Sequence, residues 1–196
     1  MSSSSELNQV DLKDKAFTRS LLYNVKEGDV KKELRFLIDG WKHSFRIKVF
    51  LREGVDKNST FKMLVNLYIT THNLEVIVNE IRDLKDKKPD YEFELDLFSP
   101  VWEDDKRTND KVLTGSILVG KKIVNEKVVY YVGVKDANNK KYLFKLGCTP
   151  YCKLKINGKE VSPEEEGERY SKAYAESLNS IIIYMAELLP DKKINK

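Results

Sequence analysis

Positively charged and aromatic side chains alternate with apolar ones along residues 45–52. Successive side chains of an extended strand point to opposite faces, so the apolar residues at positions 45, 47, 49 and 51 would face one way. The opposite face would carry Arg46, Lys48, Phe50 and Arg52. Cations displace the counterions of phosphates, and an exposed aromatic ring stacks on an unpaired base. The alternation therefore predicts a surface that binds single-stranded nucleic acid.

The same combination recurs in other segments with strand-like alternation, in both halves of the chain. In residues 61–69 a lysine and a tyrosine oppose an apolar side formed by positions 61, 63, 65, 67 and 69. In residues 127–135 a tyrosine and a lysine share one face, and lysines alternate with apolar residues in 141–146 and 153–156. A tryptophan and a lysine fall in an expected hairpin turn at positions 41 and 42. The residues predicted to contact nucleic acid are Trp41, Lys42, Arg46, Lys48, Phe50, Arg52, Lys62, Tyr68, Tyr131, Lys135, Lys141, Lys145, Lys153 and Lys155.

The distribution of charge supports this interpretation more than the net charge of +4 does. Residues 31–62 hold nine Lys or Arg against four Asp or Glu, and residues 111–160 hold eleven against three. Residues 90–110 instead hold eight acidic residues against two basic ones. The positive charge thus lies on the expected strands, where it could meet phosphates. A solvated sheet face is the simpler alternative, because exposed strand lysines also prevent edge-to-edge aggregation.

Four acidic residues alternate along residues 90–96 and offer a different chemistry. Asp90, Glu92, Glu94 and Asp96 would share one strand face, where carboxylates could hold Mg²⁺ for phosphodiester cleavage. The acid-x-lysine pattern expected on the strand of such a nuclease is absent from residues 92–96. We therefore expect no catalytic residues and keep a magnesium-dependent nuclease as an alternative, beside a solvated acidic face.

Cysteine and histidine are too scarce for a convincing zinc site or a familiar nucleophile motif. The chain has two cysteines, Cys148 and Cys152, and two histidines, His43 and His72. No phosphate-binding glycine-rich loop and no Gly-x-Ser-x-Gly motif occurs. We therefore expect no metal and no cofactor, and a reducing, cytoplasmic compartment for the two cysteines. Neither a membrane span nor a secretory leader is expected, because no apolar run approaches about 20 residues.

The periodicity of apolar residues predicts an α+β protein built from two similar halves, with four strands and a helix in the first half and four or five strands and a helix in the second. Strands are expected at 16–23, 34–38, 45–51 and 61–69, and in the second half at 91–98, 112–119, 127–135, 140–146 and 153–156. Residues 100–111 are expected to form a polar loop. Amphipathic helices are expected at 73–84 and between a capping box at Ser162–Glu165 and Pro190. The expected arrangement is a mobile tail at 1–13, one domain of two halves at 14–88 and 89–190 with antiparallel sheets backed by helices, and a C-terminal tail at 191–196.

Two consecutive segments carry a family resemblance. Gly40–Arg52 and Phe61–Thr70 form a basic strand and then a strand that runs into the helix expected at Asn73. This order, and the repeat of four strands and a helix, resembles the Whirly family and the related positive-cofactor-four proteins over residues 16–190. The resemblance implies twisted antiparallel sheets backed by helices, with single-stranded DNA bound on basic, aromatic strand surfaces. The compact, lysine-rich chain would also suit a bacteriophage single-stranded-DNA-binding protein in the host cytoplasm.

These observations predict a protein that binds single-stranded DNA, or RNA, with little sequence preference and without catalysis. The process it would serve, DNA replication among others, is left open, and so is a homo-oligomer formed through the final helix. No membrane partner is expected. The alternative from a different class is a protein-interaction or structural module, in which the acidic segments 103–105 and 164–166 dock basic partners.

Overall fold

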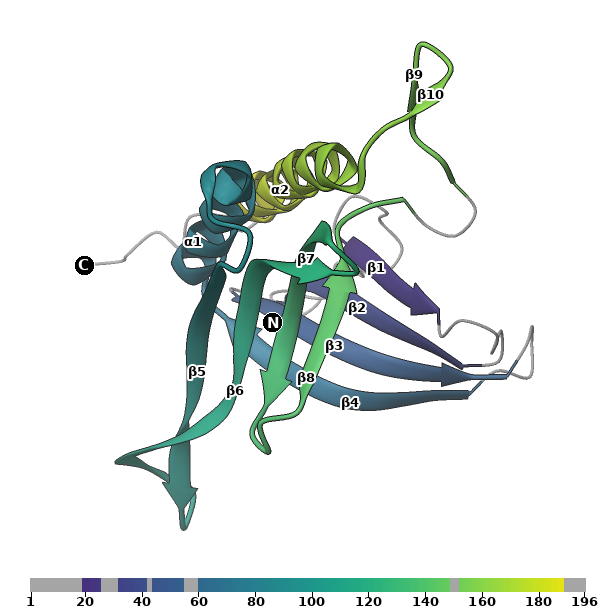
Figure 1. Cartoon of the computed structure of the whole chain (residues 1–196). Coiled ribbons are helices and arrows are strands. Elements are labelled where there is room, and N and C mark those ends of the chain that lie inside the picture. Colours follow the sequence, from purple (N-terminus) through teal and green to yellow (C-terminus); the bar gives the residue numbers. More distant parts are fainter. Residues whose placement is uncertain (1–18, 26–31, 42–43, 55–59, 149–151, 189–196) are drawn as a thin grey trace.

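The first half of the chain forms an antiparallel sheet of four strands in sequential order. The computed structural model describes residues 19–25, 32–41, 44–54, 60–148 and 152–188, so the two expected tails lie outside the described residues. The strands are β1 (Arg19–Val25), β2 (Lys32–Trp41), β3 (Ser44–Glu53) and β4 (Thr60–Ile69). Helix α1 (Thr71–Arg82) follows β4 directly, and a 3₁₀ turn, η5 (Asp83–Asp86), closes it (Figure 1).

The second half repeats this order with one addition. A second antiparallel sheet consists of β5 (Glu92–Glu103), β6 (Lys106–Val124), β7 (Lys127–Asp136) and β8 (Lys141–Lys145), again in sequential order. A separate small hairpin of β9 (Lys155–Ile156) and β10 (Lys159–Glu160) precedes helix α2 (Pro163–Leu188). The predicted α+β class, with two halves of four strands and a helix, is confirmed. The expected polar loop at 100–111 is wrong, because β5 and β6 continue through it as paired strands.

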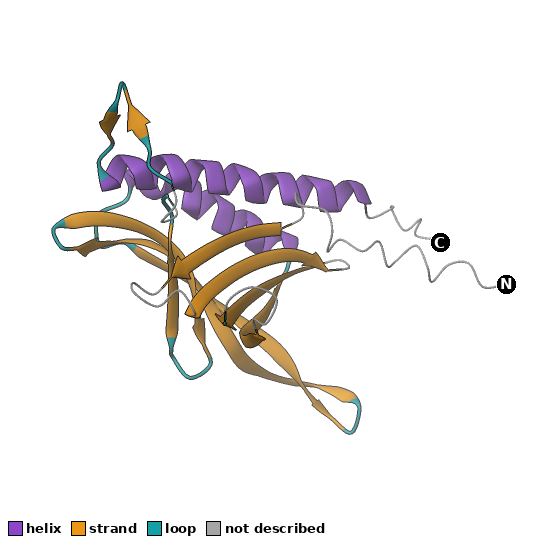
Figure 2. Ribbon diagram, turned by 90° about the vertical axis from the view of Figure 1, so that its right-hand side faces the viewer, coloured by secondary structure: helices purple, strands orange, loops and turns teal. Residues whose placement is uncertain are grey.

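Helix α2 begins and packs as its sequence predicts. The backbone N–H of Glu165 donates to Oγ of Ser162 at 3.1 Å, which is the expected cap at the residue before Pro163. Tyr174, Leu178, Ile181 and Met185 are buried along one side of the helix. Figure 2 shows both helices lying along one side of the strands. The apolar stripe of α2 is therefore the surface by which it covers the sheets.

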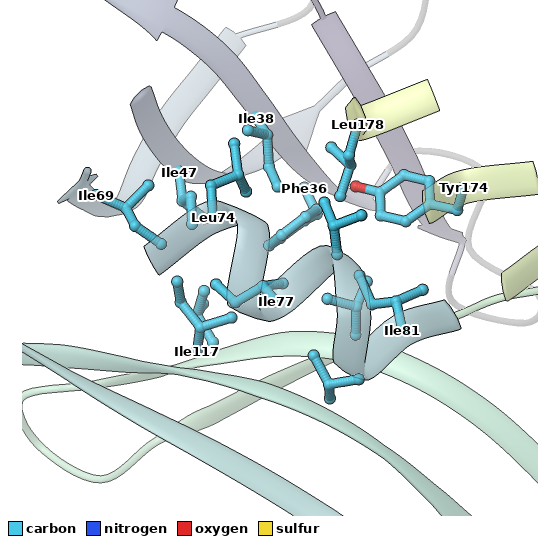
Figure 3. Close-up of a cluster of buried hydrophobic side chains, with 14 of the residues drawn as sticks. Phe36, Ile38, Ile47, Ile69, Leu74, Ile77, Ile81, Ile117, Tyr174 and Leu178 are labelled. Atoms are coloured by element: carbon cyan, nitrogen blue, oxygen red, sulfur yellow. The ribbon is translucent and has the colours of Figure 1, made fainter. Parts of the chain in front are cut away.

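Side chains from both sheets and both helices meet in one hydrophobic core around α1, as Figure 3 shows. Ile77 and Ile81 of α1 are fully buried within it. The ring of Phe36 on β2 lies with its centroid 5.3 Å from that of Phe144 on β8. The two halves of the chain thus bury their apolar faces against each other, and each half contributes strands and a helix to the same core.

Close packing of α2 depends on two glycines. A Cβ atom at Gly40 of β2 would collide with the thioether of Met185, and one at Gly167 of α2 would collide with the ring of Tyr130. Both helix-to-strand contacts therefore need the absence of a side chain. They fix α2 against the first sheet at one end and the second sheet at the other.

Lys121 is a buried lysine that ties β6 to the end of the first half. Its Nζ donates to the carbonyl oxygens of Lys85 at 3.0 Å and Lys87 at 2.8 Å, and it lies 4.7 Å from the ring centroid of Tyr130. Burial lowers the pKa of this ammonium group. The ammonium group of Lys121 donates hydrogen bonds to the carbonyl oxygens that follow α1, so its role is to stabilise the fold.

The β5–β6 hairpin extends beyond the rest of the described chain in both views (Figures 1 and 2). Gly115 marks its base: its φ of +151° lies in a region that favours glycine, and the register of β5 and β6 shifts between Leu97 and Phe98. Asp104 and Asp105, both with positive φ, form the two-residue turn at its tip. We call the part from residue 98 to residue 113 the arm.

Candidate nucleic-acid interface

The outer face of the first sheet carries the basic and aromatic residues of the first half. The apolar residues of β3 at positions 45, 47 and 49 are buried, so those between them point away from the core. The register places Arg46 between Asp39 of β2 and Tyr68 of β4. We call this surface the first-sheet face. Its described members on β2, β3 and β4 are Glu33, Arg35, Leu37, Asp39, Arg46, Lys48, Phe50, Arg52, Phe61, Met63, Asn66 and Tyr68.

A β-bulge in β4 decides which residues join this face. The register of β3 and β4 slips where Phe50 lies opposite Met63, and Leu64 is left as an extra residue. The alternation of β4 reverses across the bulge, which places Phe61 and Met63 on the first-sheet face and Lys62 on the opposite side. The sequence analysis expected Lys62 on this face and Phe61 and Met63 on the core side, which is wrong. The unpaired residue in the bulge shifts the alternation, so the residues of β4 before it point to the opposite face from the one expected.

Asp39 holds two of the predicted phosphate-binding residues side by side. Its Oδ1 accepts from Nε of Arg46 at 3.1 Å, and its Oδ2 accepts from Nζ of Lys48 at 2.9 Å. Asp39 is only 8% exposed, so a single buried carboxylate faces two cations. The cluster therefore keeps one positive charge in excess and has its cations fixed in position.

Glu33 has the same role at the other end of the face. Its Oε2 accepts from Arg35 at 3.0 Å and from Arg52 at 3.4 Å. The guanidinium carbon of Arg35 also lies 5.4 Å from the ring centroid of Phe61, within cation–π range. Together with Asp39 and its two partners, the described side chains of the face comprise four cations and two carboxylates, an excess of two positive charges.

Large apolar side chains of β4 stand exposed beside these cations. Phe61 is 55% exposed, Met63 52% and Tyr68 54%, while Phe50 on the neighbouring strand is partly buried. Grouped apolar residues of this size in contact with water mark interaction surfaces in folded proteins. The rings of Phe61 and Tyr68, near the two ends of β4, are therefore accessible to a ligand.

The outer face of the second sheet is arranged differently, because its lysines pair with the acidic residues of β5. Nζ of Lys141 lies 2.6 Å from Oε1 of Glu92, and Lys135 pairs with Glu94. The hydrogen bond from Lys135 lowers the pKa of Glu94. Burial raises the pKa of Glu92, but its hydrogen bonds and the charge of Lys141 outweigh burial and lower it. Both predicted phosphate-binding lysines thus already have anionic partners.

The prediction that Tyr131 stacks bases is wrong. Tyr131 is 3% exposed, and its hydroxyl donates to Oε2 of Glu92 at 2.7 Å. Its ring lies across Gly120 of the neighbouring strand, where a Cβ atom would collide with it. Burial, followed by the contact with Glu92, raises the pKa of the phenol. The glycine leaves room for the ring to lie against the sheet, which the alternation of β7 alone does not reveal.

The other predicted lysines of the second half are scattered. Lys145 pairs with Glu166 of α2 at 2.5 Å, and Lys153 pairs with Glu160 at 2.8 Å. Lys155 is exposed on β9. Figures 1 and 2 place the β9–β10 hairpin on the side of α2 that faces away from the sheets. Lys153 and Lys155 therefore do not adjoin the first-sheet face.

Two further predicted residues cannot be placed with the others. Trp41 is the last residue of β2, but its side chain lies outside the described residues, and so does the whole of Lys42. The predicted set is thus divided: the structure brings Arg46, Lys48, Phe50 and Arg52 together with Tyr68.

The acidic residues of 90–96 meet basic or hydroxyl groups. Beside the pairs of Glu92 and Glu94, Oδ1 of Asp96 accepts from Oγ of Ser116 at 2.5 Å, and Asp90 is exposed in the turn before β5. Within the described ranges, no three His, Cys, Asp or Glu side chains are grouped as metal ligands would be. Glu92 and Glu94 therefore stabilise the second sheet by neutralising Lys141 and Lys135.

Arg35, Phe61 and Met63 lie on the first-sheet face, but the sequence analysis did not predict them as site residues. Arg35 alternates with the buried Phe36 and could have been found from that pattern. Phe61 and Met63 carried no such signal, because their positions depend on the bulge. The exposed rings of the face are therefore partly a product of pairing between strands.

The fold and the site together define an α+β protein with a basic and aromatic sheet face. No family model matches the chain, and comparisons with curated proteins and with solved structures also found no match. In the part of the chain that the structure describes, neither helix combines the length and apolar character needed to span a membrane.

Proposed function

We propose that the protein binds single-stranded nucleic acid on the first-sheet face, with little sequence preference and without catalysis. The exposed rings of Phe61 and Tyr68 would stack on unpaired bases, and Arg35, Arg46 and Arg52 would contact phosphates through the exposed parts of their side chains. Every base has an aromatic face, so stacking of this kind reads no particular sequence.

A single observation carries the proposal: the bulge in β4 puts the exposed ring of Phe61 on the same face as Tyr68 and a row of cations. A solvated sheet face would need charge but no exposed Phe61 or Met63, which are more than half accessible to water. A strand whose apolar residues leave the core to stand beside arginines is costly unless a ligand covers them. On the second sheet, by contrast, Lys135 and Lys141 each have a carboxylate of β5 to themselves, so the pairs leave no positive charge in excess.

The experiment that tests this proposal compares one cation from each sheet. Arg52→Gln is expected to weaken binding to oligo-dT and to reduce the slope of log affinity against log salt by about 0.7 to 1, because one phosphate contact is lost. Lys141→Gln is the matched control, because Lys141 also pairs with a carboxylate but lies on the second sheet, where the acidic residues of β5 neutralise the lysines. Fluorescence polarisation with a labelled oligonucleotide at several salt concentrations measures both slopes.

The two variants separate the possible outcomes. An unchanged slope for Arg52→Gln would exclude that residue from the interface. An equal reduction by Lys141→Gln would move the interface to the second sheet or spread it over the whole surface. Circular dichroism of both variants shows whether the fold is intact.

A further inference from the structure

We infer that the arm is a second contact for single-stranded nucleic acid, in which Trp102 stacks on a base while Arg107 and Lys111 bind phosphates. The inference rests on the proposed function and extends it to a surface that the sequence analysis treated as a polar loop. The strand would then be held at two places, one on a sheet face and one on the hairpin.

The pairing of β5 and β6 puts the relevant side chains on one side of the arm. Trp102 lies directly opposite Arg107, and Pro100 lies opposite Lys111. Residues directly opposite each other in an antiparallel pair share a face, and alternate residues of one strand do so as well. Phe98, two residues before Pro100, therefore belongs to the same side. This side thus combines two aromatic rings with two cations.

The aromatic rings of the arm are more exposed than any packing role requires. Trp102 is 62% exposed and Phe98 56%, the two largest side chains of the arm. A folded chain rarely leaves a tryptophan this open unless it meets a partner. Their position on a hairpin that extends past the rest of the described chain leaves this side open to a ligand (Figures 1 and 2).

Unlike Lys135 and Lys141 of the second sheet, which pair with carboxylates, Arg107 and Lys111 are available to bind phosphates. Arg107 and Lys111 are both exposed, and within the described residues no ion pair joins either of them to a carboxylate. The acidic residues at the tip of the arm do not lie on this side: Glu103 pairs with Lys106, and Asp104 and Asp105 form the turn. Arg107 and Lys111 outnumber Asp110, the carboxylate that lines a hollow with them, so they leave one positive charge in excess for a phosphate backbone.

A second irregularity in the pairing opens a hollow beside these cations. The register shifts between Pro100 and Trp102, so residues 108–110 of β6 form a bulge. A hollow of about 200 Å³ lies there, lined by Pro100, Arg107, Lys111 and the bulge residues, Asp110 among them. The hydroxyl of Thr108 donates to the carbonyl of Val101 at 3.0 Å and holds the bulge in place. A hollow lined by two cations and one carboxylate offers a recess for a phosphate or the edge of a base.

Trp102 can report on its own contact, because the chain contains only two tryptophans. In the Trp41→Phe protein, all tryptophan emission comes from Trp102. Titration with oligo-dT is expected to quench this emission with the same midpoint as polarisation of a labelled oligonucleotide, since a stacked base quenches the indole. In the otherwise unchanged chain, Trp102→Ala is expected to weaken binding about 5- to 150-fold, while Trp102→Phe keeps most of the affinity.

The possible results separate this inference from the proposed function. Binding by polarisation without quenching, together with unchanged affinity for Trp102→Ala, overturns the role of the arm and leaves the first-sheet face standing. Absence of any binding by the unchanged protein overturns both. Emission of Trp102 that changes with protein concentration but not with oligo-dT also overturns the inference and identifies the arm as a contact between copies of the chain.

Discussion

Replacement of Phe36 by alanine is expected to lower the free energy of unfolding by about 3–5 kcal/mol, the usual cost of removing a fully buried phenylalanine. Phe36 is 0% exposed, and its ring packs against that of Phe144. The two residues belong to different sheets, β2 and β8, so the cavity would open where the two halves of the chain meet. Urea unfolding followed by circular dichroism measures the loss.

The matched control is Phe98→Ala, because Phe98 is the same residue type in a half-exposed position on the arm. Its effect on stability is expected to stay within about 0.5 kcal/mol. Should Phe36→Ala fail to fold, Phe36→Leu leaves a smaller cavity and should show the same effect at reduced size. Amide hydrogen exchange adds a sharper criterion: in the Phe36→Ala variant, the backbone amides of both halves should lose protection from exchange together. A loss confined to β1–β4 would contradict a core shared between the halves.

The double variant Phe61→Ala and Tyr68→Ala is expected to weaken binding to single-stranded DNA by at least about 30-fold, because stacking contributes about 1–3 kcal/mol per base. Both rings are more than half exposed on the first-sheet face, so their removal should leave the fold intact. Because the cations are unchanged, the salt dependence should stay as in the unchanged protein. Polarisation titrations at two or more salt concentrations measure both quantities.

Two further variants make this result specific to stacking. Tyr68→Phe keeps a ring and should retain the affinity, whereas loss of affinity on removal of the hydroxyl alone would indicate a hydrogen bond instead. Ile123→Ala removes a side chain of similar exposure from the second sheet and should have no effect. An unchanged affinity in the double variant would exclude these two rings from the interface.

The features that depend on one segment at a time could be predicted from the sequence. The alternation of residues 45–52 placed Arg46, Lys48, Phe50 and Arg52 on one face, as the structure has them. Ser162 and its capping box located the start of α2, and the spacing of apolar residues identified its buried side. Local periodicity and capping chemistry are sufficient for such features, because they act within one strand or one helical turn.

The features that depend on pairing between distant segments could not be predicted in this way. The extra residue Leu64 reverses the facing of Phe61, although the apolar alternation of β4 continues without a break. Tyr131 is buried because Gly120 of another strand leaves room for its ring. The composition of residues 100–111 predicts a polar loop, but two strands pair through Pro100 to form the arm. In each case the outcome depends on how the segment pairs with another strand.

The electrostatics of the two sheets also emerged only from the fold. Charge counts along the chain made the strands of both halves look basic. In the structure, the carboxylates of β5 lie on the same face as Lys135 and Lys141 and neutralise them. Asp39 and Glu33 leave the cations of the first sheet in excess. Of the residues predicted to contact nucleic acid, only those on the first-sheet face therefore remain grouped as one candidate interface.

The most direct test of the central claim is a titration of the unchanged protein with single-stranded and double-stranded oligonucleotides of equal length, at about 50 and about 200 mM salt. If each of the three arginines of the first-sheet face contacts one phosphate, affinity for the single strand should fall about 20-fold between these concentrations. Binding to the single strand should also be tighter than to the duplex, whose bases are not free to stack. Absence of binding at the lower salt concentration, or equal affinity for both forms, would contradict the account.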